Sequence, residues 1–211
     1  MNINEIAKLA GVSRATVSRY LNNGYVSEEK KKIIRKVIEE TGYQPSSQAQ
    51  MLRTKKTKLV GVILPKIDSN TISREVAGIS DILTKKGYQL ILANTNNNIE
   101  EELKYLSLFK DNQVDGVIFI ATILTKQHRD MLKEYKVPIV LLGQRLEGYP
   151  CIFQDDQKAA MTLTEQMVKT GSKFGYITVT DKDEAVGRKR MSGVEEILSK
   201  NKIEFGSEYV K

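Results

Sequence analysis

The residues best suited to chemistry in this chain lie at positions 14–21, in the segment RATVSRYL. A helix that begins after Ser13 would turn Val17 and Leu21 inward and leave the other side chains outside. Arginine can bond two acceptors of guanine at once, and hydroxyl groups reach phosphates or base edges. The segment therefore predicts a helix that lies in the major groove of duplex DNA. Its outward face carries Arg14, Ala15, Thr16, Ser18 and Arg19.

Two further helices are predicted to position this face. Before it, Asn2 and Glu5 have the spacing of a capping box, and Gly11 ends the first helix in a tight turn. The predicted apolar face of that helix consists of Ile6, Leu9 and Ala10. A third helix over residues 26–41, capped by Ser27 and ended by Gly42, would close a small core. Its inward residues are expected to be Ile33, Ile34, Val37 and Ile38. We interpret residues 1–43 as a helix-turn-helix headpiece; the alternative is an ordinary helical hairpin with a polar outer face.

The charge of the chain is concentrated in its first quarter. The formal net charge is +7. The whole excess falls within residues 1–58, and the remainder carries equal numbers of basic and acidic side chains. A basic head on a neutral body is the distribution expected of a phosphate-binding segment. The single cysteine, Cys151, rules out an internal disulfide and suits a reducing cytoplasm. No apolar run is long enough to span a bilayer, and the amino terminus lacks the apolar stretch of a signal peptide.

Residues 44–58, with the sequence QPSSQAQMLRTKKTK, are interpreted as a linker. Ser46 or Ser47 could cap a short helix over residues 48–53, too short to be stable in water by itself. One interpretation is a hinge helix that forms on DNA and wedges Leu52 into the minor groove. The other is a basic linker whose Met51 and Leu52 fold back on the body.

From residue 59 onward, short apolar strands alternate with helices. Strands are predicted at 59–64, 89–93, 116–120 and 139–142, and helices at 72–86, 99–112 and 126–135. A second set begins near Cys151, with a helix at 157–170, a strand at 176–180 and a helix at 187–199. Continuously apolar strands favour a doubly wound α/β body with a parallel sheet that is covered on both faces. We expect two lobes, residues 59–148 and a partial one at 149–211.

Ligands of such sheets bind at the carboxyl ends of the strands. Several polar and basic side chains are predicted to lie there or at the edge of the second lobe. These are Lys66, Asp68 and Ser69 after the first strand, Gln144 and Arg145 after the fourth, and Arg188, Lys189 and Arg190. Converging cations suit an anionic ligand, and this favours a phosphorylated sugar over a neutral one. The alternative is that these are solvated loop charges.

The remaining reactive side chains give little support to catalysis. Asp155 and Asp156 precede a helix, so capping is expected of them rather than hydrolysis. His128 lies among charged neighbours and is expected to be solvated. Cys151 has no nearby His or second Cys, and no glycine-rich phosphate loop follows the first body strand. We therefore expect no enzyme, no metal and no cofactor.

Taken together, the motifs resemble those of the LacI/GalR family of bacterial transcription repressors, from residue 2 to about residue 200. The segments that carry the resemblance are GVSRATVSRYLN, GYQPSSQAQML, KLVGVILPKIDSN, NQVDGVIF, VPIVLLGQR and GRKRMSGV. The resemblance implies a helical headpiece, a hinge and a periplasmic-binding-protein-like body. It also implies a cytoplasmic homodimer that binds operator DNA and represses a carbohydrate-utilisation operon under the control of a sugar or sugar phosphate.

The resemblance also assigns roles to individual residues. It implies base contacts for Arg14, Ala15 and Arg19, phosphate contacts for Thr16, Ser18 and Asn22, and hinge contacts for Gln48, Ala49 and Leu52. Arg190 matches the arginine that holds the effector between the lobes. The chain departs from the family pattern in the loop KIDSNTIS, which lacks the usual aromatic residues. It also stops at Lys211, so the second lobe is expected to be incomplete at its carboxyl end, either as a fragment or by natural truncation.

Two other functions fit parts of this pattern. One is a sugar-phosphate-binding, enzyme-like body fused to a DNA-binding head. The other is a truncated DNA-binding protein that senses no effector.

Overall fold

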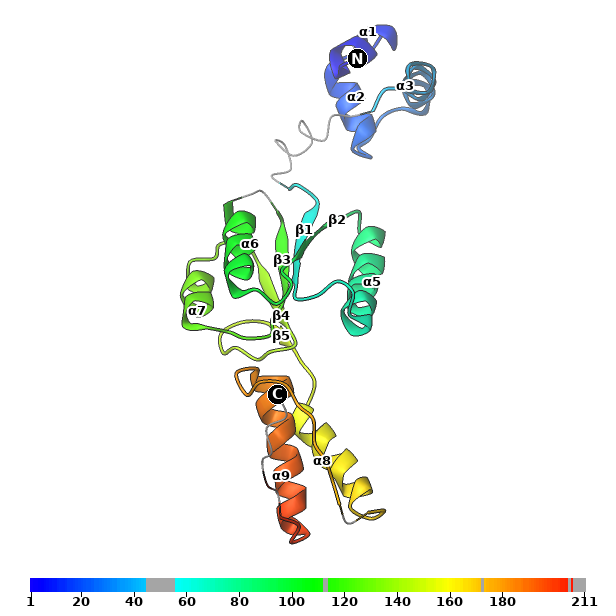
Figure 1. The fold of residues 1–211 in the computed structure, drawn as a ribbon. Helices are drawn as coiled ribbons and strands as arrows, with labels where there is room; N and C mark the ends of the chain where they lie inside the picture. Colours follow the sequence, from blue (N-terminus) through cyan, green and yellow to red (C-terminus); the bar gives the residue numbers. More distant parts are fainter. Residues whose placement is uncertain (45–55, 112–113, 172, 205, 207–211) are drawn as a thin grey trace. The chain divides into compact units, whose positions relative to one another are not determined.

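The computed structural model describes residues 1–44, 56–111, 114–171, 173–204 and 206. These residues form two compact units, Met1–Thr57 and Lys58–Lys211 (Figure 1). The predicted hinge contacts Gln48, Ala49 and Leu52 lie outside the described residues.

The first unit contains three helices, α1 (Ile3–Leu9), α2 (Arg14–Leu21) and α3 (Glu28–Thr41). The capping box of Asn2 and Glu5 is present, and the Ser13 side chain caps α2. Gly42 ends α3 in the left-handed conformation that glycine adopts at low cost. Ser27 occupies the N-cap of α3 but makes no capping hydrogen bond through its side chain. The predicted three helices are therefore confirmed, with the third beginning two residues later than expected.

The core of this unit differs in detail from the predicted one. Ile6, Val17 and Ile34 are fully buried, as expected. The prediction for Leu9 is wrong, because its side chain is 58% exposed while Ala7 is buried. Ile33 is also exposed. In α1 and α3 the buried face is narrower than the apolar residues of the sequence suggest. Each of these short helices packs against the other two along one narrow stripe of its surface.

The second unit contains a five-stranded parallel sheet with the order β2-β1-β3-β4-β5. The strands are β1 (Leu59–Leu64), β2 (Gln89–Asn94), β3 (Gly116–Ile120), β4 (Ile139–Leu142) and β5 (Cys151–Ile152). The predicted doubly wound parallel sheet is thereby confirmed. β1 and β3 lie in the interior of the sheet, and β2 lies at an edge, which leaves Ile91 and Leu92 partly exposed.

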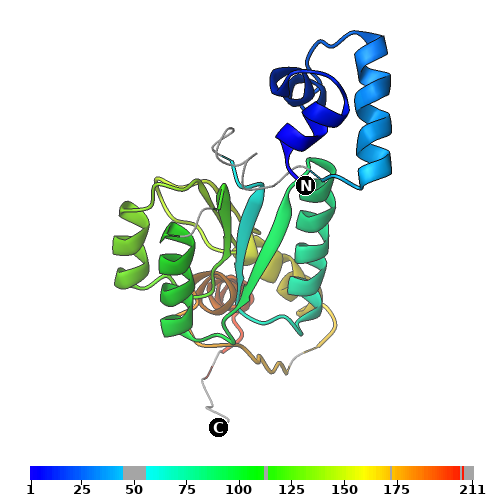
Figure 2. The same ribbon diagram turned by 90° about the horizontal axis from the view of Figure 1, so that it is seen from above.

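Helices cover both faces of this sheet (Figures 1 and 2). They are α5 (Asn70–Lys85) on one face, and α6 (Ile99–Asp111) and α7 (Lys126–Lys133) on the other. Val62, Leu64 and Ile120 pack towards α5, and a larger cluster around Phe119 and Leu106 fills the opposite side. These layers place the carboxyl ends of the strands, and the loops that follow them, along one edge.

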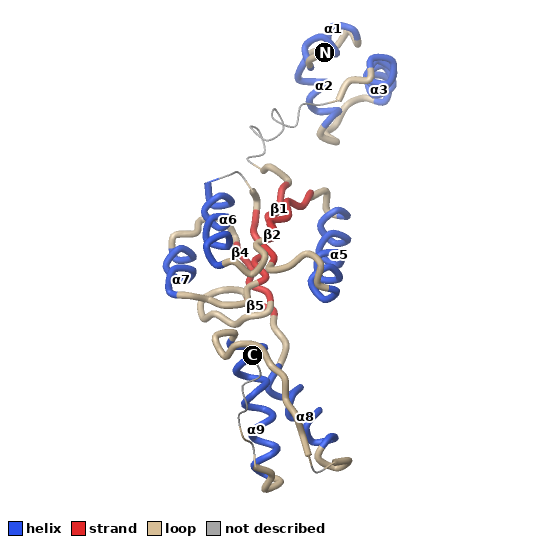
Figure 3. Tube along the Cα trace, viewed as in Figure 1, coloured by secondary structure: helices blue, strands red, loops and turns tan. Residues whose placement is uncertain are grey.

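The second lobe begins after β5 with α8 (Asp156–Met167), a π-helical segment η1 (Glu184–Lys189) and α9 (Arg190–Lys200). The predicted strand at 176–180 is wrong: the segment has no regular structure and Ile177 is 98% exposed. Among the described residues, strands occur only in the sheet of the first lobe (Figure 3). An isolated apolar run cannot hold a strand conformation without a partner strand to satisfy its backbone groups.

Candidate nucleic-acid interface and ligand edge

The predicted DNA-contacting face of α2 is set by its cap and its buried residue. Ser13 Oγ accepts a hydrogen bond from the backbone N–H of Thr16 at 3.2 Å and lies 2.9 Å from Thr16 Oγ1. Val17 is fully buried and fixes the rotation of the helix. With the helix held in this way, Arg14, Ala15 and Arg19 are exposed. The structure thus brings the three predicted base-reading residues onto one accessible surface.

The predicted phosphate contacts differ in their exposure. Thr16 and Ser18 are half-buried, and Asn22 is exposed at the carboxyl end of α2. The Asn22 side-chain amide donates a hydrogen bond to the Ser18 carbonyl. Asn22 is the C-cap residue of α2, and its backbone N–H also bonds to carbonyls of the last turn. One donor of its side-chain amide is therefore occupied within its own helix.

One contact in the headpiece was not predicted. The neighbouring Tyr20 of α2 is the main cause that raises the pKa of the Arg35 guanidinium of α3. Arg35 therefore lies beside the helix that carries the predicted base contacts. No periodicity in the sequence pairs these two residues, because the contact joins polar positions of different helices.

We call the carboxyl ends of the strands, with the loops that follow them, the ligand edge. Its first loop follows β1. Lys66 and Asp68 are exposed and form a weak ion pair, with Nζ and Oδ2 3.7 Å apart. The loop is fastened to β2 because Asn94 Oδ1 accepts a hydrogen bond from the Ile67 backbone N–H at 3.1 Å. Ser69 occupies the N-cap of α5 without capping it through its side chain. These predicted residues lie where the sheet topology requires, directly after a central strand.

Gln144, after β4, is a bridge between the lobes. It is only 4% exposed. Its Nε2 donates hydrogen bonds to the Thr122 carbonyl at 2.7 Å and to Asp183 Oδ1 at 2.8 Å. The same Asp183 oxygen accepts from the backbone N–H groups of Ala185 and Val186 and so caps η1. Its predicted neighbour in this loop, Arg145, is exposed. The geometry therefore uses the amide nitrogen of Gln144 to join β4 to the second lobe.

Arg190 is held by a buried acid. Its Nε donates to Asp156 Oδ1 at 2.7 Å. Asp155 caps α8, as expected, by accepting from the Lys158 backbone N–H at 3.1 Å. The capping expected of Asp156 is wrong, because Asp155 occupies the N-cap and the Asp156 carboxylate pairs with Arg190 instead.

Arg188 and Lys189, the two basic residues before Arg190, also have close neighbours. Arg188 pairs with Glu184 at 3.0 Å, and Lys189 lies over the Phe153 ring, 5.8 Å from its centroid. Lys66, Arg188 and Arg190 each lie within 4 Å of a carboxylate oxygen, so the positive charge at these three positions is partly balanced.

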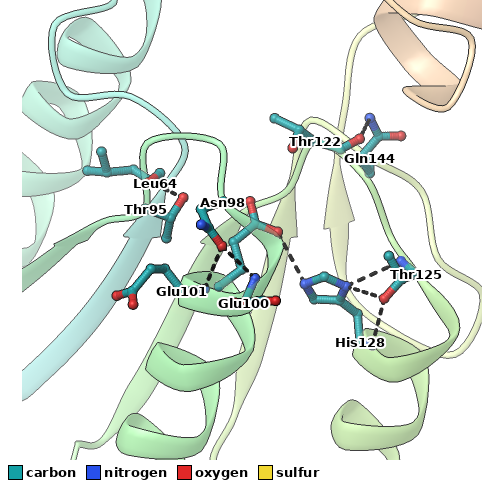
Figure 4. Close-up of polar contacts among 10 residues, drawn as sticks. Leu64, Thr95, Asn98, Glu100, Glu101, Thr122, Thr125, His128 and Gln144 are labelled. Carbon is teal, nitrogen blue, oxygen red and sulfur yellow. Dashed lines mark hydrogen bonds and ion pairs between the residues drawn. The ribbon is translucent and has the colours of Figure 1, made fainter.

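The prediction that His128 is solvated is wrong. Its side chain is completely buried between α6 and α7, and its Nε2 lies 3.1 Å from Glu102 Oε2, which is also buried. Figure 4 shows the opposite ring nitrogen directed at Thr125. The surrounding charged residues in the sequence point outward, so they hid the burial of this one side chain. The available signal was on α6, where Glu102 shares the spacing of the buried Leu106 and Phe109.

Among the described residues, no cluster of three or more His, Cys, Asp or Glu side chains could hold a metal ion. In the same part of the chain, no helix is both long and apolar enough to cross a membrane.

The helical head and the parallel-sheet body together define a bacterial regulatory protein built on a periplasmic-binding-type domain. Residues 2–46 match the family model described as bacterial regulatory proteins, lacI family. Residues 57–208 match the model of periplasmic binding proteins and sugar binding domain of LacI family. The chain belongs to the LacI family.

Two curated relatives illustrate the likeness. The sucrose operon repressor of Staphylococcus xylosus is 37% identical over 194 residues, which cover 92% of this chain and 61% of the relative. The catabolite control protein A of Priestia megaterium is 34% identical over 100% of this chain and 64% of its own length. The chain thus spans about three-fifths of the length of these relatives.

Solved structures agree with this assignment. The transcription regulator CcpA of Lactococcus lactis has a TM-score of 0.64 and 35% identity, over 70% of this chain and 55% of that one. The lac repressor dimer bound to operator and the anti-inducer ONPF has a TM-score of 0.85 over 97% of this chain and 63% of that one. At 21% identity, this second likeness supports the fold alone.

Proposed function

We propose that this chain is a cytoplasmic transcriptional repressor that binds operator DNA through its headpiece and responds to a saccharide through its body. The observation that carries the proposal is the face of α2. A capped helix with a buried Val17 exposes Arg14 and Arg19 within a segment that holds the whole positive excess of the chain. Exposed arginines on such a helix can read guanine in the major groove, while the surrounding positive charge attracts phosphates.

The DNA contacts in this proposal are the residues expected from the sequence. Arg14, Ala15 and Arg19 face the bases, and Thr16, Ser18 and Asn22 face the phosphates. Gln48, Ala49 and Leu52 form the hinge contacts. Two headpieces in a homodimer would read half-sites one helical turn apart, which is the usual spacing of such operators.

The ligand of the body is proposed to be an uncharged sugar rather than a sugar phosphate. Lys66, Arg188 and Arg190 each have a carboxylate partner, so the electrostatic reason to prefer a phosphate is weakened. Paired acids and arginines are good partners for sugar hydroxyl groups, because they offer both hydrogen-bond acceptors and donors. One relative is named as a sucrose operon repressor, which supports a saccharide. The proposed contacts are Lys66, Asp68, Ser69, Gln144, Arg145 and Arg190.

An enzyme-like body is the competing proposal. It would need a catalytic acid or base at a strand end. Three acids near the carboxyl ends of the strands and the second lobe are already engaged: Asp68 with Lys66, Asp156 with Arg190, and Asp183 with the amino end of η1. The curated relatives described above are named as transcriptional regulators. We therefore propose that the chain is not an enzyme.

Genome-wide footprinting in the source organism followed by binding to the recovered duplex tests the function. We expect a near-palindromic site, an affinity that falls steeply with salt, and much weaker binding to a scrambled duplex. Sucrose and sucrose 6-phosphate added separately then distinguish a neutral from an anionic sugar. Equal, salt-sensitive binding to every duplex would contradict sequence-specific regulation. Loss of operator binding only with the phosphorylated sugar would reverse the proposed ligand class.

A further inference from the structure

The proposed function leaves the buried pair of Glu102 and His128 unexplained. Their side chains are 1% and 0% exposed, and the facing atoms Glu102 Oε2 and His128 Nε2, 3.1 Å apart, make no hydrogen bond to any of the described residues. Burying a carboxylate is costly unless it is well paired. Glu102 lies in the first turn of α6, where the positive end of the helix dipole favours an acid.

The hydrogen bonds on the other side of the ring fix its orientation. The backbone N–H of Thr125 donates to His128 Nδ1 at 3.2 Å, and Thr125 Oγ1 lies 2.8 Å from the same nitrogen. A backbone N–H can only donate, so Nδ1 is the acceptor and the proton of the neutral ring is on Nε2, facing Glu102. The ring also stacks on Phe119 of β3, with centroids 5.7 Å apart. His128 is therefore clamped between α6, β3 and the loop that begins α7.

That loop, residues 121–125, also contacts Gln144, the residue that joins the two lobes. Its Thr122 carbonyl accepts the hydrogen bond from Gln144, and the two residues lie close together in Figure 4. Gln144 in turn binds Asp183, which caps η1. η1 is followed directly by α9, which begins at Arg190. One short loop therefore connects a buried pair in the first lobe with the segment that carries the proposed ligand-binding arginine.

We propose that Glu102 and His128 are positioning residues that hold loop 121–125 so that the Thr122 carbonyl stays aligned with Gln144, and thereby set the contact of Gln144 with Asp183. A sugar bound at the carboxyl ends of the strands would act on loop 121–125, whose position is fixed by Glu102 and His128. The consequence for regulation rests on the proposed function, but the mechanical link does not. The competing explanation is that the pair only stabilises the packing of α6 on α7.

Amide hydrogen exchange in the whole chain, measured without DNA or sugar, separates these explanations. The reporters are the N–H groups of Ala185 and Val186, which Asp183 caps in the other lobe. In Glu102→Gln and His128→Gln we expect their exchange to accelerate about tenfold, as local opening becomes easier. The matched control is Glu134→Gln, which removes an exposed ion pair between α6 and the C-cap of α7, Lys110–Glu134 at 2.9 Å. It should leave exchange at both reporters unchanged.

A variant of Gln144 tests whether the effect of Glu102 reaches Asp183 through Gln144. Gln144→Ala should accelerate exchange at the two reporters directly. If the path runs through this residue, Glu102→Gln should add little to Gln144→Ala, whereas independent effects would multiply. Unchanged exchange at Ala185 and Val186 in a folded Glu102→Gln protein would overturn the proposal.

The wild-type protein offers a second test that needs no variant. His128 is the single histidine of the chain, so nitrogen NMR of histidine reports this ring alone. We expect a neutral ring with a protonated Nε2 and an unprotonated Nδ1. A ring that interconverts freely between the two neutral tautomers would show that it is not clamped, and would overturn the proposal. Both tests give an answer even if the chain binds no operator, so a failure of the proposed function is distinguishable from a failure of this inference.

Discussion

Asp156 Oδ1 and Arg190 Nε are 2.7 Å apart, and this ion pair joins the first turn of α8 to the first residue of α9. The acid is almost fully buried, with 6% of its side chain exposed, whereas the arginine side chain is 43% exposed. The pair therefore anchors an accessible guanidinium on a buried carboxylate. It orients the residue proposed to hold the sugar and packs the two helices of the second lobe together.

Removing Arg190 should consequently destabilise the protein as well as weaken its response to sugar. Arg190→Ala leaves Asp156 buried without its charged partner, so we expect the free energy of unfolding to fall by about 2 kcal/mol. Arg188→Ala is the control, because Arg188 pairs with the exposed Glu184 and should cost at most about 0.5 kcal/mol. Urea denaturation of the three proteins measures the difference. Similar losses in both variants would contradict the role given to Asp156.

Arg19 should govern sequence preference rather than general affinity. Arg19→Ala is expected to weaken binding to the recovered operator by about 1–3 kcal/mol and to relax the preference at one base pair. Lys104→Ala, which removes an exposed charge on α6 of the body, should leave binding unaltered. Fluorescence anisotropy with operators that vary at one position measures both effects. An equal loss on operator and scrambled duplex would assign Arg19 to the phosphates instead.

Two glycines should respond in opposite directions to the same substitution. A Cβ on Gly193 of α9 would lie 2.4 Å from the Gln157 carbonyl oxygen of α8, so Gly193→Ala must push the helices apart. We expect a loss of about 1–3 kcal/mol. Gly78 in α5 has no atom within 4 Å of the added position, and Gly78→Ala should gain about 0.5–1 kcal/mol in helix propensity. Thermal unfolding gives both signs, and a stabilising Gly193→Ala would refute the close packing of α8 and α9.

Tyr135 should make stability depend on pH in the alkaline range. Its hydroxyl donates to the Leu106 carbonyl at 2.8 Å, and burial strongly raises the pKa of its phenol. A raised pKa means that the neutral phenol stabilises the folded state. This contribution is complete below the unfolded pKa of about 10 and is lost as the pH rises towards the folded value. The unfolding free energy of the wild type should therefore fall more steeply between pH 9 and pH 11 than that of Tyr135→Phe. Parallel curves would contradict the raised pKa of the Tyr135 phenol.

Local features of the sequence determined most of the elements. Ser13, Gly42 and the apolar periodicity place the helices of the headpiece, and the apolar runs place the first four strands within one residue of where they lie. These signals act between residues close in sequence, since a cap or a helix face needs only neighbours within one or two turns. The basic charge of the first 58 residues is likewise a property of composition, and folding does not alter it.

The tertiary structure alone decided which polar side chains are paired and buried. His128 lies in a charged stretch, yet α6 brings Glu102 against it, and Arg190 meets Asp156 from a position 34 residues away. The segment at 176–180 has the composition of a strand but no neighbour to form a ladder with it among the described residues. In each case the outcome depends on which distant element packs alongside. The pairing of side chains from distant segments is a relation between those segments, and no pattern within one segment encodes it.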